Sequence, residues 1–286
     1  MTDLELNQLR CEKWHLDGKP VRTLDDARSF IESVGLSLMY PARPAMLIPT
    51  FVGAWYGTDQ QLPQQRAFVD PRARDATDLM VRLLRDQLAY EANLGDENNA
   101  LLISASIFPY FYTLVGERNP KQAPQPGPRS PYSELACDTY QIIHRKGPIS
   151  KLKLLDELGK GISVPALDRS LAELWSKLRI TRVDYDEREG ASWDVLQRWS
   201  PQAVSDGVNC SVGEALSALL SKYLDCVIAA DRQELESFFG NFVSRSRVRE
   251  AVNALLSARE LSFVSVGSRS LIQVTQTQPA HHEGTR

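Results

Sequence analysis

The stretch of sequence that decides the fold is residues 211–275, SVGEALSALLSKYLDCVIAADRQELESFFGNFVSRSRVREAVNALLSARELSFVSVGSRSLIQVT. It begins with apolar residues at helical spacing, continues through a shorter helical pattern that Gly240 interrupts, and contains a third pattern at residues 244–260. Two alternating runs follow, at residues 261–266 and 271–275. Three helices and a two-strand ribbon predict a winged helix-turn-helix, with the third helix in the recognition position.

The third helical pattern of this stretch has an apolar face and an arginine-rich face. At 100° per residue the apolar positions form one stripe, made of Val248, Ala251, Val252, Leu255 and Leu256. Residues 244–275 carry five arginines and two glutamates, a local charge of +3 in a chain of net charge −3. Arginine at an exposed helix start suits phosphate oxygens, and arginine or asparagine also reads base edges. The residues predicted here to contact DNA are Arg245, Arg247, Arg249, Asn253 and Arg269; the alternative is a solvated helix face.

A fainter copy of the pattern precedes this stretch, at residues 133–199. Three helical runs and two extended runs compose it, at residues 133–145, 150–158, 163–178, 180–185 and 192–196. Aligning residues 174–180 with residues 255–261 places the two helix-to-wing junctions in register. The alignment predicts an internal repeat of about 80 residues, and therefore a second winged helix.

The first copy and the connector before it combine a basic segment with an acidic wing. Between Arg118 and Lys153 there are seven lysines or arginines and two acids, a local charge of +5. Lys151, Lys153 and the later Arg169 are predicted to contact DNA, and solubilising charge on a linker is the alternative. The wing of this copy is acidic and would repel phosphate; its acids are Asp184, Asp186, Glu187, Glu189 and Asp194.

Residues 117–132 hold five prolines and predict a stiff, extended connector. We therefore expect a mixed α/β N-terminal domain at residues 1–116, winged helices at residues 133–200 and 208–275, and a flexible tail at residues 276–286. The predicted fold class is α+β, mainly helical, with short β wings.

The N-terminal domain is predicted to combine helices with short strands. A capping box at Thr23 and Asp26 begins a helix that Gly35 ends, and residues 36–40 alternate like a strand. A long helix is predicted at residues 75–94, because its leucines recur at helical spacing.

Other N-terminal stretches are less regular. Residues 1–22 are weakly patterned, and the apolar residues 46–57 predict a loop-like packing segment. Within that segment Trp55 and Tyr56 are candidates for stacking on a base, with core filling as the stronger alternative. Residues 101–114 are interpreted as a strand or a short helix in the N-terminal core.

Composition places the chain among soluble globular proteins, with 43% hydrophobic and 24% charged residues. The first residues lack the apolar segment of a signal peptide, and no apolar run is long enough to span a bilayer, so we expect a cytoplasmic protein without a membrane partner. The four cysteines show no close metal-ligand spacing and are expected to be reduced. No nucleotide-binding loop, metalloprotease motif or hydrolase motif occurs, so no metal, cofactor or catalytic residue is assigned.

Three features together carry a resemblance to a known family. They are the run VRTLDDARSFIESVGLSLMYP at residues 21–41, the later FPYFY at residues 108–112, and the tandem winged helices from residue 133. The chain resembles the bacterial tandem winged-helix proteins related to crosslink-repair DNA glycosylases. The resemblance implies winged helices arranged around a DNA-binding channel, and duplex DNA as partner.

Active members of that family carry a short catalytic Gln-x-Gln or Gln-x-Asp motif near the N-terminus. The best candidate counterpart here is residues 36–40, LSLMY, which contains neither glutamine nor aspartate. The prediction is therefore a DNA-binding protein without robust catalysis. Two alternatives remain open: an active glycosylase with a diverged motif, and a protein-interaction or regulatory module.

Overall fold

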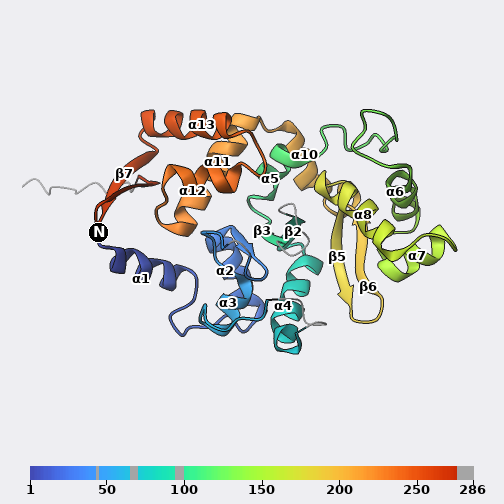
Figure 1. Ribbon diagram of the computed structural model, residues 1–286, viewed down its shortest axis with the longest axis horizontal. Coiled ribbons are helices and arrows are strands. Elements are labelled where there is room, and N and C mark those ends of the chain that lie inside the picture. The colour runs from blue at the N-terminus through green and yellow to red at the C-terminus, as the bar shows by residue number, and fades with distance from the viewer. Residues whose placement is uncertain (43–44, 65–69, 94–99, 276–286) are drawn as a thin grey trace, which may run out of the picture.

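Helices and short antiparallel strands alternate along the chain, and the computed structural model describes residues 1–42, 45–64, 70–93 and 100–275 (Figure 1). The predicted α+β class is confirmed. The N-terminal elements form a three-stranded antiparallel sheet in the order β1-β3-β2, near the centre of Figure 1, with helices around it. These elements are α1 (Asp3–Lys13), α2 (Leu24–Val34), β1 (Leu36–Leu38), α3 (Phe51–Tyr56), η1 (Pro71–Ala73), α4 (Arg74–Arg85), β2 (Ala89–Asn93), β3 (Ala100–Ser104) and α5 (Phe108–Val115).

Two units of the same topology follow, each with three helices and an antiparallel hairpin. The first contains α6 (Glu134–Lys146), β4 (Ile149–Ser150), α7 (Lys151–Leu158), α8 (Val164–Ser176), β5 (Ile180–Asp186) and β6 (Gly190–Val195). The second contains α11 (Val212–Val227), α12 (Arg232–Phe239), α13 (Arg245–Ser257), β7 (Leu261–Val266) and β8 (Arg269–Val274). Between them lie α9 (Leu196–Trp199) and α10 (Pro201–Asn209), which the sequence did not predict.

The junction between third helix and wing is built identically in the two units. Leu178 and Arg259, which the sequence alignment pairs, both adopt a left-handed backbone, with φ of 51° and 62°. The next residue in each unit donates its N–H to a carbonyl five residues back, from Arg179 to Leu174 and from Glu260 to Leu255, at 3.0 Å in both. The predicted internal repeat is confirmed at this junction.

Short polar side chains begin the helices of both units. Their oxygens accept a backbone N–H from the first turn, which satisfies one of the donors that a helix start leaves open. The capping residues are Ser133, Ser150, Ser163, Ser211 and Asp231. These caps fix where each helix starts, and they lie within one residue of the predicted starts.

One cluster of buried apolar side chains extends from the N-terminal part into both winged units. Phe111 of α5 meets Phe242 of the second unit edge to face, with 5.0 Å between ring centroids. Trp175 of the first unit donates its indole N–H to the carbonyl of Glu91 in β2, at 3.1 Å. Because the core is continuous, a division into domains at residues 117–132 stays a prediction.

The proline-rich connector is bonded to the body of the protein at its start. The backbone N–H of Glu117 donates to the carbonyl of Lys177 at 3.1 Å. The guanidinium of Arg179 donates to the carbonyls of Asn119, at 3.2 Å, and Gln122. This part of the connector therefore lies along the α8–β5 junction.

The acidic wing of the first unit is docked onto α4, as the β5–β6 hairpin beside α4 in Figure 1 shows. Asp184 forms an ion pair with Arg85 at 2.6 Å, and Glu187 forms one with Arg74 at 3.3 Å. Two of the five wing acids thus pair with cations of the N-terminal part, and Glu189 pairs with Lys153 of α7.

The predicted helix at residues 75–94 is wrong in its second half. The helix α4 ends at Arg85, Gln87 turns the chain with a φ of 54°, and Ala89–Asn93 pairs with β3 as strand β2. Leu94 lies outside the described residues. Alanine and glutamate in β2 favour a helix locally, but pairing with β3 and burial override that propensity.

Three other N-terminal predictions need correction. The weakly patterned residues 1–22 contain α1, begun by a capping box of Thr2 and Glu5. The loop-like segment contains the short helix α3. Residues 101–114 hold both a strand and a helix, β3 and α5. Over the described ranges, no helix is long and apolar enough to cross a membrane.

Candidate nucleic-acid interface

Helix α13 is held by its apolar stripe, which leaves its arginine face in solvent. Val248, Val252 and Leu255 are buried, and α13 packs on α11 and α12. The side chains of Arg245 and Arg247 are exposed at the start of the helix. Neither forms an ion pair with any residue that the structure describes, so both charges are available to a ligand.

The N-terminus of helix α13 has no side-chain cap. Ser244 occupies the N-cap position, but its hydroxyl lies 3.0 Å from that of Ser246 and accepts no first-turn N–H. The free backbone N–H groups and the helix dipole make such a helix start attractive to anions. Asn253 is exposed on the same helix, two turns further along.

Two other predicted contact residues of the second unit are already paired. Arg249 forms a bidentate ion pair with Glu236 of α12, with both N–O distances at 2.7 Å. Hydrogen bonding from Arg249 lowers the pKa of Glu236, so the carboxylate is ionised at neutral pH. Arg269, at the start of β8, is paired with Asp3 of α1. Sequence reasoning did not find Glu236 or Asp3, because they meet their arginines only through tertiary packing.

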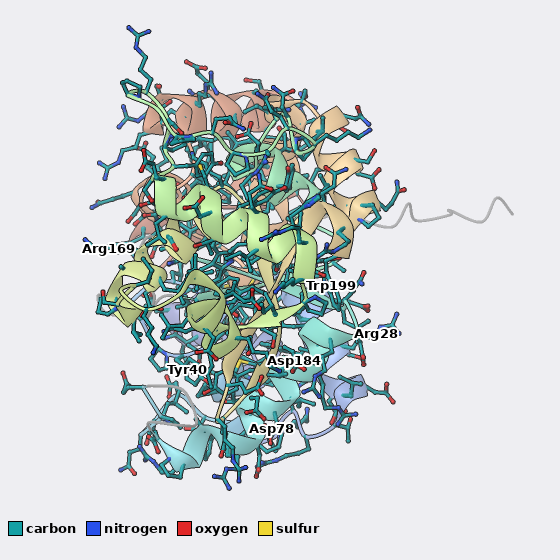
Figure 2. The ribbon with its side chains drawn as sticks, turned by 90° about the vertical axis from the view of Figure 1, so that its right-hand side faces the viewer. Arg28, Tyr40, Asp78, Arg169, Asp184 and Trp199 are labelled. Atoms are coloured by element: carbon teal, nitrogen blue, oxygen red, sulfur yellow. The ribbon has the colours of Figure 1, made fainter. Side chains whose placement is uncertain are left out.

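The basic residues of the first unit lie far from α13. Lys151 pairs with Asp168 at 2.5 Å, and Lys153 pairs with Glu189 at 2.9 Å. Arg169 on α8 is exposed and lies at the edge of the molecule (Figure 2). In Figure 1, α7 and α13 occupy opposite ends of the longest axis. The structure therefore divides the predicted contacts into two groups.

The two stacking candidates belong to neither group. Trp55 is half-buried in α3 and lies under the guanidinium of Arg22, 4.7 Å from its ring centroid. Tyr56 is 38% exposed, and its hydroxyl donates to the carbonyl of Arg72 at 2.9 Å. Helix α3 lies on the opposite side of the molecule from α13 in Figure 1, so the structure does not bring these rings to the arginines.

The strand that the sequence offers as the best candidate counterpart of the family's catalytic motif is part of the core. Leu36 and Leu38 are each 1% exposed, and the Ser37 hydroxyl is 3.0 Å from the carbonyl of Leu38. Just beyond the strand, the hydroxyls of Tyr40 and Thr77 are 2.6 Å apart. Residues 36–40 thus present no carboxamide or carboxylate that would orient an attacking water.

A small cavity does lie at the end of this strand. Tyr40, Glu91 and Asp184 are among the residues that line its 30 Å³ (Figure 2 labels Tyr40 and Asp184). A cavity of that size holds about two water molecules and no base. Glu91 is bonded to Arg182 at 2.6 Å. Within the described ranges, no three His, Cys, Asp or Glu side chains are grouped to hold a metal ion.

The fold and its exposed helix define a tandem winged-helix protein with an arginine-bearing third helix. Neither a protein-family profile nor a curated protein sequence matches the chain. Among solved structures, the Streptomyces sahachiroi DNA glycosylase AlkZ is similar to it, with a TM-score of 0.60 and 14% sequence identity. The match covers 96% of this chain and 70% of that one. The tandem winged-helix fold that the sequence resemblance implies is confirmed, and at this identity the likeness concerns the fold alone.

Proposed function

We propose that the protein binds duplex DNA without robust catalysis, through the start of helix α13. The observation that carries the proposal is the pair of exposed arginines, Arg245 and Arg247, beside an uncapped helix start. Such a surface presents cationic side chains and backbone donors together to phosphate oxygens. The fold shared with a DNA glycosylase agrees with this partner.

In this proposal the second winged unit makes the main contact. The lysines at 151 and 153 of the first unit are ion-paired, and its wing is docked onto α4. Asn253 is placed to reach a base edge if α13 enters the major groove. The test is anisotropy of a labelled duplex over a series of salt concentrations. Binding that is absent or independent of salt would favour the protein-docking alternative.

Glu236→Gln should strengthen DNA binding. The substitution removes the carboxylate that neutralises Arg249 and frees a third arginine on the same helix. The log-log salt slope should then steepen by about 0.9, the increment for one more phosphate contact. Glu260→Gln is the matched control, because it changes the net charge equally and releases no arginine of α13. Equal slopes for the two variants would contradict a role for Arg249.

The protein should not excise alkylated bases. Residues 36–40 are buried and carry no carboxamide or carboxylate, and the adjoining cavity has no room for a base. The measurement is the formation of abasic sites in alkylated duplexes at protein concentrations that saturate binding. Excision that depends on the protein would move the glycosylase alternative to first place.

A further inference from the structure

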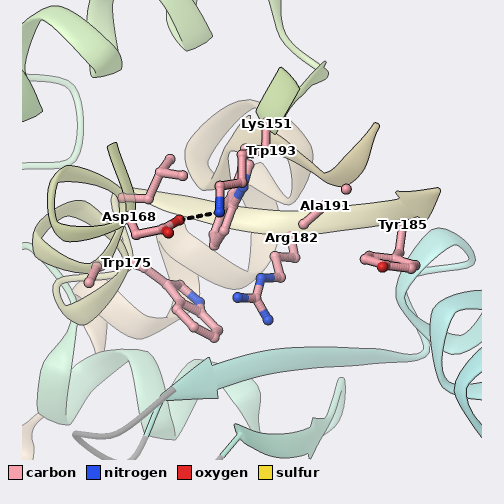
Figure 3. A pocket seen from close by; sticks show the side chains of 10 residues that line it. Lys151, Asp168, Trp175, Arg182, Tyr185, Ala191 and Trp193 are labelled. Atoms are coloured by element: carbon pink, nitrogen blue, oxygen red, sulfur yellow. Dashed lines mark ion pairs between the residues drawn. The ribbon is translucent and has the colours of Figure 1, made fainter. Parts of the chain in front are cut away.

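One pocket of the first winged unit is closed to ligands by its own contacts. It lies between helix α8 and the β5–β6 hairpin and has a volume of 260 Å³ (Figure 3). Its two tryptophans are each 2% exposed, and the guanidinium of Arg182 lies over both rings, 4.5 and 4.9 Å from their centroids. Lys151 is paired with Asp168, as the dashed line in Figure 3 marks. This pocket therefore offers a ligand neither tryptophan ring and no free charge.

A larger pocket lies where the start of the proline-rich connector meets helices α9 and α10. Its volume of 520 Å³ is within the roughly 300–1,000 Å³ that is usual for ligand sites. Two cations, Arg118 and Lys121, line it, and no aspartate or glutamate is among the described residues of its wall. Its exposed neutral polar side chains are carboxamides and one hydroxyl, at Asn119, Gln122, Ser205 and Asn209. The pocket is therefore positively charged and rich in hydrogen-bond donors.

The two cations of this pocket are accessible and carry no neutralising partner. The guanidinium of Arg118 donates only to backbone carbonyls, those of Val208 at 3.3 Å and Thr113 at 3.4 Å, and the residue remains exposed. Lys121 is exposed as well. Neither cation forms an ion pair within the part of the chain that the structure describes. Their charges are thus available to an anion that enters the pocket.

A tight turn presents Lys121 to the pocket. The backbone N–H of Gln122 donates to the carbonyl of Asn119 at 3.1 Å, and Pro120 occupies the second position of the turn, where its fixed φ is favourable. The guanidinium of Arg179, which is 4% exposed, donates to the carbonyls of both Asn119 and Gln122. A ligand therefore meets a turn that is already held in place, which lowers the entropic cost of binding.

This pocket also gathers free charge from the basic segment of the sequence, residues 118–153. Three lysines of that segment, Lys146, Lys151 and Lys153, are ion-paired with acids of the first winged unit. Arg118 and Lys121 are not paired, and both line the same pocket. The segment's positive charge is thus concentrated at the connector rather than at α7.

We propose that this pocket binds a phosphate group, through Arg118, Lys121 and the surrounding carboxamides. Phosphate oxygens accept hydrogen bonds from these kinds of side chain. The phosphate belongs either to the backbone of the duplex or to a small phosphorylated molecule. The duplex source rests on the proposed function, and the connector, α10 and α13 all lie in the upper part of Figure 1. The small-molecule source does not depend on α13.

The first test is titration calorimetry with inorganic pyrophosphate at constant ionic strength. Lys121→Ala should weaken pyrophosphate about fivefold, the upper end for a solvent-exposed ion pair, and Lys121→Arg should retain binding. Lys160→Ala is the matched control, because Lys160 is exposed, has no ion pair among the described residues and does not line the pocket. Its affinity should equal that of the wild type.

A second variant tests the pocket without changing its charge. Ser205→Phe fills the pocket from α10 and should also weaken pyrophosphate, whereas Gln202→Phe, exposed on the same helix but outside the pocket wall, should not. Equal affinities for these two variants would show that pyrophosphate does not enter the pocket and would contradict the proposal.

Duplex binding distinguishes the two sources of the phosphate. If the pocket holds a backbone phosphate, Lys121→Ala should flatten the log-log salt slope of duplex binding by about 0.9, and Lys160→Ala should leave the slope unchanged. Weakened pyrophosphate with an unchanged duplex slope would identify a small phosphorylated molecule. If Lys121→Ala changes neither pyrophosphate affinity nor the duplex slope, the proposal is overturned, whatever the duplex does at α13.

Discussion

Replacing both Arg245 and Arg247 with alanine should flatten the log-log salt dependence of duplex binding by about 1.8, because each phosphate that the protein no longer neutralises lowers the slope by about 0.9. Both side chains are exposed at the start of α13 and have no ion-pair partner within the described part of the chain. Between 50 and 200 mM salt, the wild-type protein should therefore lose about tenfold more affinity than the variant. Anisotropy of one labelled duplex at several salt concentrations measures both quantities.

The matched control is the double variant Lys153→Ala and Arg169→Ala, which removes two exposed cations from the first unit. Its salt slope should stay close to that of the wild type if the second unit makes the contact. Unfolding free energies of both double variants should stay within about 0.5 kcal/mol of wild type, because the side chains are on the surface. An unchanged slope in the α13 variant would remove this helix as the DNA surface.

Asn253 provides a separate test of base reading. Asn253→Ala should leave binding to random duplexes unchanged. If α13 reads a preferred sequence, the variant should lose discrimination at one position, by about 1–3 kcal/mol. A uniform loss over all sequences would show instead that Asn253 contacts the backbone.

The winged units were predictable because their apolar spacing, their capping residues and their helix-breaking residues all indicate the same helices and strands. The stripe from Val248 to Leu255 fits a single helix period, and Ser163 begins its helix as a capping serine should. Leu178 and Arg259, which the alignment of the two junctions pairs, both adopt the left-handed backbone although neither is a glycine. Local pattern and tertiary structure coincide here.

One strand of the N-terminal sheet, β2, was not predicted because it carries no strand-like signal of its own. Strand β2 reads AYEAN, with two alanines and a glutamate and no β-branched residue. Its conformation is imposed by hydrogen bonding to β3, which follows a segment outside the described residues. A prediction from local helix propensity therefore extends α4 through Gln87 and does not include strand β2.

The ion pairs could not be predicted from sequence in either unit. Arg249 looks like a free recognition arginine until α12 places Glu236 beside it. The acidic first wing suggests repulsion of phosphate, whereas packing shows that two of its acids, Asp184 and Glu187, form ion pairs with α4. In both places the charge available to a ligand depends on which elements pack together, and spacing along the chain holds no information about that.

Among the ion pairs of the described residues, the pair of Glu91 and Arg182 should have the largest effect on stability, because both of its side chains are nearly buried. It joins the N-terminal sheet to the first wing at 2.6 Å, with side chains 3% and 11% exposed. Removing one partner leaves the other charge buried, which typically costs about 3–5 kcal/mol. Glu91→Gln and Arg182→Met should each lower the free energy of unfolding by that amount, measured by urea denaturation.

The combined variant Glu91→Leu and Arg182→Met should recover most of the loss, because two apolar side chains of similar size leave no charge unpaired. A double-mutant cycle that uses Glu91→Leu, Arg182→Met and their combination would then give a large coupling energy between sheet and wing. The exposed pair of Arg74 and Glu187, which joins the same wing to α4, is the matched comparison, and its disruption should cost about 1 kcal/mol or less. Single variants of the buried pair that cost no more than this would show that two contacts are sufficient to hold the wing in place. These are the edge-to-face packing of Trp175 on Trp193 and the hydrogen bond from the Trp175 indole N–H to the carbonyl of Glu91.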